Sequence, residues 1–95
     1  MSAYVIAIVD IKDPVRYERY RAMVLPTITA YGGRFIARGG RTEVLEGAWA
    51  PRRMVIVEFP SLDRAKEWWS SAEYAEAKAI RQATSEGTLI VVEGV

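Results

Sequence analysis

The most distinctive polar group in the sequence is an arginine followed by two glycines, Arg38-Gly39-Gly40. A guanidinium can clamp a carboxylate or an enolate through paired hydrogen bonds, and glycines allow a ligand to approach the backbone closely. Side chains of an extended strand alternate between its two faces, so Arg34, two such periods before Arg38, is expected on the same face. The group predicts a site for a small organic anion. Its structural alternative is a strand bulge that carries a solvated arginine.

Glu58 is the second candidate, because it interrupts an otherwise apolar segment, Met54–Phe59. A carboxylate in such surroundings either acquires a raised pKa, which suits general acid/base catalysis, or pairs with an arginine. Arg38, Arg53 and Arg81 are the partners expected for a structural ion pair. The catalytic hypothesis therefore takes Glu58 as the acid/base and Arg38 as the anion clamp.

Aromatic side chains offer walls for a ligand site. Their hydroxyl and indole groups require hydrogen-bond partners, although aromatic residues at helical spacing usually belong to the core. We expect a cavity between helices and sheet that suits a small planar organic acid, lined by Tyr20 and Trp68. Arg81 is expected to face this cavity or to cap a backbone carbonyl. Trp49 lies in a connecting segment and is expected at an interface.

The chain contains no histidine and no cysteine, and its net charge is +1. These absences argue against histidine-ligated metal or haem, thiolate nucleophiles and disulfides, so we expect no metal and no cofactor. Acidic residues separate the basic ones, which does not predict nucleic-acid binding. The first apolar run, residues 4–9, is too short to cross a membrane and follows no signal-peptide pattern. We therefore expect a cytoplasmic protein.

Four segments have the apolar, β-branched composition of strands: residues 4–9, 34–37, 54–59 and 88–93. The second is expected to pass through a bulge at Gly39-Gly40 and to resume from Thr42 to Glu46. Three of the four are apolar on both alternations, which is typical of strands covered on both faces.

Two helical segments separate these strands. The first is predicted to start at Asp13-Pro14 and to end at Gly32-Gly33. The second is predicted to start after the cap Ser61, to break and restart at Ser70-Ser71, to run to about Thr84 and to be closed by Gly87.

The order strand, helix, strand, strand, helix, strand predicts one domain over residues 1–95. Right-handed crossovers then give the ferredoxin-like βαββαβ arrangement, a four-stranded antiparallel sheet with both helices on one face. The helix-free face is apolar and must be covered. The sheet of a second copy is the simplest partner, so we expect a homodimer through this face.

Several spaced motifs resemble a bacterial family known as domain of unknown function 1330. They cover essentially the whole chain, and consist of residues 31–40 (Tyr-Gly-Gly-Arg-Phe-Ile-Ala-Arg-Gly-Gly), Leu45-Glu46-Gly47, residues 53–61, Trp68-Trp69, residues 71–74, Ile80-Arg81 and Val92-Glu93-Gly94. The resemblance implies a dimeric α/β barrel, in which two ferredoxin-like subunits pack sheet to sheet. It implies no particular activity, because the wider superfamily includes cofactor-free monooxygenases, lactone isomerases, haem-degrading enzymes, chlorite dismutases and ligand-sensing domains.

Two functional hypotheses follow. The first is a cofactor-independent enzyme, monooxygenase-like or isomerase-like, that acts on a small anionic or aromatic metabolite. Its site would use Glu58 and Arg38 for catalysis, with the substrate-binding residues Tyr20, Gly39, Gly40, Trp68 and Arg81. The second is a module that binds a small molecule without chemistry, or that serves only dimerisation.

Overall fold

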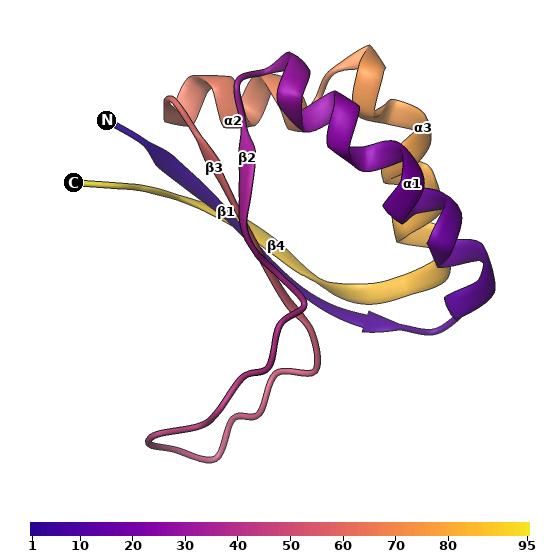
Figure 1. The fold of residues 1–95 in the computed structure, drawn as a ribbon, viewed down its shortest axis with the longest axis vertical. Helices are drawn as coiled ribbons and strands as arrows, with labels where there is room; N and C mark the ends of the chain where they lie inside the picture. The colour runs from indigo at the N-terminus through magenta and orange to yellow at the C-terminus, as the bar shows by residue number, and fades with distance from the viewer.

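The fold is built on an antiparallel sheet of four strands in the order β2-β3-β1-β4. The computed structural model describes all of residues 1–95. Figure 1 shows the helices gathered on one side of this sheet. The predicted ferredoxin-like arrangement, with the first and third strands in the middle, is confirmed. In chain order the elements are β1 (Ala3–Ile11), α1 (Pro14–Ala30), β2 (Arg34–Arg38), β3 (Met54–Phe59), α2 (Leu62–Trp69), α3 (Ala72–Thr84) and β4 (Ser85–Glu93).

Each helix begins at a side chain that accepts a hydrogen bond from a backbone amide of the first turn. Asp13 accepts from the amide three residues later, and Pro14 occupies the first helical position, where it has no amide to lose. Ser61 and Ser71 cap α2 and α3 in the same way. The predicted helix starts, including the break at Ser70-Ser71, are therefore confirmed.

The core lies between the helices and one face of the sheet. Every second residue of β1, from Ala3 to Val9, is buried there. Trp68 is also buried, stacks on Tyr74 at 4.0 Å between ring centroids, and donates its indole hydrogen to Thr27 Oγ1 at 3.1 Å. Its polar group is thus satisfied inside the core. None of the three helices has both the length and the apolar composition needed to cross a membrane.

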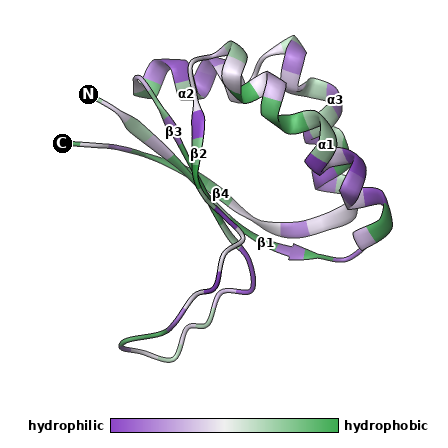
Figure 2. Cartoon of the chain, viewed as in Figure 1, coloured by the Kyte–Doolittle hydropathy of each residue, from purple (hydrophilic) through white to green (hydrophobic).

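The opposite face of the sheet is apolar but carries no helix. Three isoleucines of neighbouring strands lie in register on this face: Ile6 of β1 pairs with Ile56 of β3 and with Ile90 of β4. The side chains of Ile90 and Val92 remain about half exposed, at 49% and 48%. Figure 2 shows hydrophobic colouring where the strands cross, although the helices cover only one side. An exposed apolar surface of this kind is typical of a face that packs against another protein surface.

Residues 40–53 form an extended loop, which we call the arm. Figure 1 shows that it projects from the sheet on the side away from the helices. The predicted strand from Thr42 to Glu46 is wrong, because pairing between β2 and β3 ends at Arg38 and Val55. The segment before β3 continues its ladder with β1 for one more residue, because the amide of Val9 donates to the carbonyl oxygen of Arg53 at 2.9 Å. The arm is left without a neighbouring strand.

The predicted role of Gly87 as the end of a helix is also wrong. Helix α3 ends at Thr84, which confirms the predicted helix end, but β4 begins at Ser85, so Gly87 lies inside a strand, opposite Val9. A Cβ atom at this position would overlap the carbonyl oxygen of Ile8. The glycine therefore permits a close approach of two backbones.

Replacing Gly87 by alanine should push β4 away from β1. We expect the free energy of unfolding to fall by about 1–3 kcal/mol, as for other overpacked sites. The matched control is Gly40→Ala, because no atom lies within 4 Å of a Cβ atom there. It should change stability by less than about 0.5 kcal/mol. Urea denaturation measures both, and equal midpoints for Gly87→Ala and wild type would contradict the close approach.

Candidate functional site

A bulge in β2 places its two arginines on opposite faces of the sheet. Arg34 lies opposite Glu58, whereas Arg38 lies opposite Val55, and the register shifts between Phe35 and Ala37. The extra residue changes the alternation by one position. The expectation that Arg34 and Arg38 share a face is therefore wrong. The bulge itself lies at Ile36, before the predicted place at Gly39-Gly40.

Glu58 lies on the helix-free face, in an ion pair with Arg34. The Nε atom of Arg34 donates to it at 2.7 Å, and the hydroxyl of Tyr4 donates at 3.3 Å. The hydrogen bond from Arg34 holds the pKa of Glu58 below its ordinary value of 4.5, against the opposing effect of burial, with further help from Ser2 and Tyr4. The partner is thus none of the three arginines expected. Glu58 is an ionised carboxylate at neutral pH, on the opposite face from Arg38.

Arg38 lies on the helix side of the sheet. Its guanidinium lies 4.2 Å from the ring centroid of Phe35, and one terminal nitrogen donates to the carbonyl oxygen of Arg21 at 3.0 Å. The following residue, Gly39, has φ +68°, and a Cβ atom there would overlap the guanidinium of Arg53. The close approach predicted at this glycine is therefore made by an arginine side chain. Gly40 is exposed, and no atom lies within 4 Å of the place that a Cβ atom would take there.

A chain of hydrogen bonds joins α1 to α3. The hydroxyls of Tyr20 and Tyr74 lie 3.1 Å apart, and Arg81 Nε donates to the hydroxyl of Tyr74 at 3.2 Å. Burial, and then the neighbouring Tyr74, raises the pKa of Tyr20 far above its ordinary value. Tyr20 is therefore a protonated hydroxyl at neutral pH. It can donate a hydrogen bond but does not act as a base.

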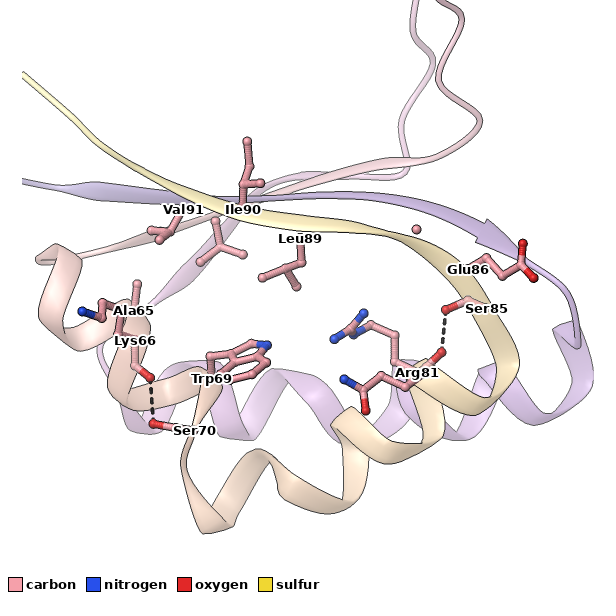
Figure 3. Close-up of a pocket in the computed structure, with 13 residues that line it drawn as sticks. Ala65, Lys66, Trp69, Ser70, Arg81, Ser85, Glu86, Leu89, Ile90 and Val91 are labelled. Carbon is pink, nitrogen blue, oxygen red and sulfur yellow. Dashed lines mark hydrogen bonds between the residues drawn. The ribbon is translucent and has the colours of Figure 1, made fainter.

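An open cleft of about 890 Å³ lies between helices and sheet along β4, and of the predicted lining residues Tyr20, Trp68 and Arg81 only Arg81 lines it. Figure 3 shows Trp69 and Arg81 reaching from the helices toward Leu89 on the strand. Trp68, expected as a wall, lies in the core instead, and its neighbour Trp69 is 42% exposed and lines the cleft. Helical spacing does not distinguish the two, because Trp68 and Trp69 follow the buried Ala65 by three and four residues, and both spacings lie on the same helix face.

Arg81 also lines a second, smaller cavity of about 30 Å³ between α1, α3 and the sheet. Tyr20 and Arg38 line the same cavity, so three of the predicted site residues come together there. Glu58, Gly40 and Trp68 are not among its lining residues. Sequence patterns missed Arg53, which joins this cavity through the turn that precedes β3.

The side chains provide no cluster typical of a metal centre. No three carboxylates lie close enough together to hold an ion, and the chain has no histidine or cysteine. The polar groups that face the two cavities are guanidinium, amide, ammonium, hydroxyl and single carboxylate groups. Such a set is suited to recognising an organic molecule that carries negative charge.

The four-stranded antiparallel sheet, the helices on one face and the cleft between them define a ferredoxin-like α+β protein. The model of one family of this class, a domain of unknown function (DUF1330), matches residues 2–95. The chain therefore belongs to the DUF1330 family.

Solved structures with the same fold come from several bacteria. A protein of unknown function from Rhodopseudomonas palustris is 20% identical, with a TM-score of 0.79 over 99% of this chain and 82% of that one. A dimeric ferredoxin-like protein of unknown function from Jannaschia sp. CCS1 is 11% identical, with a TM-score of 0.69 over 100% and 99%. SnoaB from Streptomyces nogalater, a cofactor-independent oxygenase, is 9% identical, with a TM-score of 0.67 over 99% and 93%. No curated protein matches the chain. These identities establish a shared fold.

The ion pair of Glu58 predicts a pH-dependent contribution to stability. A carboxyl group whose pKa is lowered by folding stabilises the fold above its unfolded pKa, and this contribution is lost as the pH falls through the folded pKa. We therefore expect Glu58→Gln to lower the melting temperature at pH 7 and to match wild type at about pH 2, well below the ordinary pKa.

Arg34→Gln is the matched variant, because it removes the other half of the same pair. It should lower the melting temperature at pH 7 by a similar amount. Thermal unfolding followed by circular dichroism at both pH values provides the measurement. A difference between wild type and Glu58→Gln that persists unchanged in acid would show that the pair is not its source.

Proposed function

We propose that the protein binds a small planar organic anion in the cleft along β4 and converts it without a cofactor. The observation that carries this proposal is the composition of the cleft, in which one oriented arginine faces an indole and an aliphatic wall. Trp69 and Leu89 supply flat apolar surface, and Arg81 supplies a fixed positive charge. A volume of about 890 Å³ is within the range of small-molecule sites.

Arg81 is oriented by its neighbours before any ligand arrives. Its Nε atom donates to Tyr74, so its terminal nitrogens are available for two oxygens of a carboxylate, enolate or phenolate. A charge that is already oriented stabilises a developing anion without the cost of reorganisation. An enolate or phenolate held in this way either reacts with dioxygen or is reprotonated at another carbon. These are monooxygenase-like and isomerase-like reactions.

The fold is compatible with such chemistry, because SnoaB, described as a cofactor-independent oxygenase, has the same architecture. Fold alone does not assign a reaction. Binding without turnover is the second candidate, and the position of Glu58 on the opposite face favours it. That residue was the expected acid/base, and the cleft contains only Glu86 as a carboxylate.

We also propose that two copies pair through the helix-free face of the sheet, as a dimeric α/β barrel. Structural neighbours from Jannaschia sp. CCS1 and Bacteroides fragilis are described as dimeric. The half-exposed side chains of Ile90 and Val92 and the apolar β1 and β3 residues of that face would be covered by this pairing. The arm projects on the same side and exposes Leu45 and Trp49, which suits the interface position expected for Trp49.

The ligand proposal is tested with Arg81→Gln. Planar aromatic carboxylates and phenolates are titrated while tryptophan fluorescence is followed, since Trp69 lines the cleft. Loss of a hydrogen bond to a charged ligand should weaken binding by about tenfold to a hundredfold. Arg41→Gln is the control, because Arg41 is an exposed arginine on the arm that contacts only Glu43.

Any compound that binds is then incubated with wild type under air. Oxygen consumption indicates oxygenation, and a new isomer detected by NMR indicates isomerisation. Binding with neither result favours the non-catalytic candidate. If Arg81→Gln binds every ligand as well as wild type does, Arg81 is not the anion site of the cleft.

The dimer is tested with Ile90→Asp. A carboxylate at the centre of an apolar interface loses its water without gaining a partner, so we expect the dissociation constant to rise at least about 100-fold. Val15→Asp is the control, because Val15 is an exposed residue of α1, on the helix side. Sedimentation velocity measures both variants. A wild-type chain that is monomeric at micromolar concentration would refute the dimer.

A further inference from the structure

The arginines of this protein fall into two groups. Seven of the ten lie within 4.0 Å of a carboxylate. The other three are Arg38, Arg53 and Arg81, and all three line the same small cavity between α1, α3 and the sheet. They reach it from the end of β2, from the turn before β3, and from α3. The arginines without an acidic partner are therefore gathered at one place in the fold.

The cavity contains no group that neutralises them. None of its eleven lining residues is acidic. A fourth arginine there, Arg21, is already paired with Glu18 at 2.9 Å. The other polar side chains of the lining are the hydroxyls of Tyr17 and Tyr20. Arg53 and Arg81 are half-buried there, whereas Arg38 is exposed. Positive charges gathered in one place repel one another and attract an anion, most strongly where they are shielded from water.

Arg53 shows this imbalance most directly. Its Nε atom is buried and has no hydrogen-bond acceptor. No other buried side-chain nitrogen or oxygen of the protein lacks a hydrogen-bond partner. Buried donors in folded proteins are almost always paired. The guanidinium of Arg53 lies against Gly39, where φ is +68° and a side chain would overlap it. The backbone is thus shaped to admit this arginine, although no acceptor of the chain meets it.

The other two guanidiniums are oriented by neutral acceptors. Arg38 donates to the carbonyl oxygen of Arg21 at 3.0 Å, and Arg81 donates to the hydroxyl of Tyr74 at 3.2 Å. These bonds fix the direction of each side chain but leave its charge uncompensated. Tyr74 also joins the hydroxyl of Tyr20 at 3.1 Å. The site therefore has an organised set of donors.

We propose that this cavity is an oxyanion site, in which Arg38, Arg53 and Arg81 bind one carboxylate or phosphate group. Its volume of about 30 Å³ leaves room for a compact group and none for an aromatic ring. The planar guanidinium forks match the oxygen pairs of such anions. This cavity is distinct from the cleft along β4, with which it shares only Arg81.

The test uses the full chain labelled with ¹⁵N-arginine, so that each Nε–Hε group gives its own NMR signal. Inorganic phosphate and acetate are titrated separately, each against sodium chloride at the same ionic strength. We expect saturable shifts of the Arg38, Arg53 and Arg81 signals and no such shift of Arg41. Tighter binding of phosphate identifies a phosphate ligand, and tighter binding of acetate identifies a carboxylate. Shifts that chloride reproduces fully would overturn the oxyanion site.

Two variants sharpen the result. Arg38→Met and Arg53→Met each remove one guanidinium and should raise the dissociation constant at least about tenfold, whereas Arg41→Met should leave it unchanged. Wild-type affinity in both variants would exclude the site. The melting temperature of wild type should also rise with the preferred anion more than with chloride, which requires no variant.

These measurements are separable from those on the cleft. Arg38 and Arg53 do not line the cleft, so their replacement should leave the binding of planar aromatic ligands unchanged. If no aromatic ligand binds but phosphate or acetate still shifts the three arginine signals, the oxyanion site stands without the proposed enzyme. If aromatic ligands bind while both anions behave like chloride, the cleft stands alone.

Discussion

The irregular pairing between β2 and β3 determines the chemistry of both faces of the sheet. Phe35 lies opposite Val57 and Ala37 lies opposite Ile56, so Ile36 has no partner on β3. Arg34, before the bulge, stays on the helix-free face opposite Glu58, and the extra residue turns Arg38 toward the helices. Regular pairing would have put both arginines on the face where Glu58 lies. One of them would then share its carboxylate or remain unpaired on a surface that is otherwise apolar. The bulge instead removes Arg38 from that surface and adds it to the cavity beside Tyr20.

The helix-free face follows from the same arrangement. Once Arg34 and Glu58 neutralise each other near its edge, the middle of the face consists of the isoleucines of β1, β3 and β4. A sheet of four strands with helices on one side leaves the apolar side chains of its other face in contact with water. A chain of 95 residues has only one small core, between helices and sheet, to stabilise it. The arm extends from this side with Leu45 and Trp49 exposed. Exposed apolar side chains of the face and of the arm therefore lie on the same side of the sheet.

Features set by neighbouring residues could be predicted from the sequence. The caps Asp13, Ser61 and Ser71 identified every helix start, because a cap acts within one turn of its own chain. Features set by contact between distant segments could not. The partner of Glu58 depended on the register between β2 and β3, and the face of Arg38 depended on a bulge that the order of residues did not locate. Gly87 resembled a helix end, although it lies in β4 where a Cβ atom would overlap the carbonyl oxygen of Ile8. The apolar pair Val44-Leu45 resembled a strand, but a strand also needs a neighbour, and no backbone hydrogen bond joins residues 42–46 to another segment.

The position of Glu58 limits the chemistry that the cleft can perform under the proposed function. Its carboxylate is ionised, paired and on the far face, so it has no access to a ligand beside Arg81 within one subunit. Tyr20 remains protonated, because burial raises its pKa far above neutrality. Apart from the carboxylate of Glu86, the polar groups near Arg81 therefore stabilise negative charge and donate hydrogen bonds rather than abstract protons. Such a site suits ligands that ionise readily by themselves, such as phenols and enols with low pKa values. The substrate would then supply the reactivity, and the protein would supply orientation and a fixed positive charge.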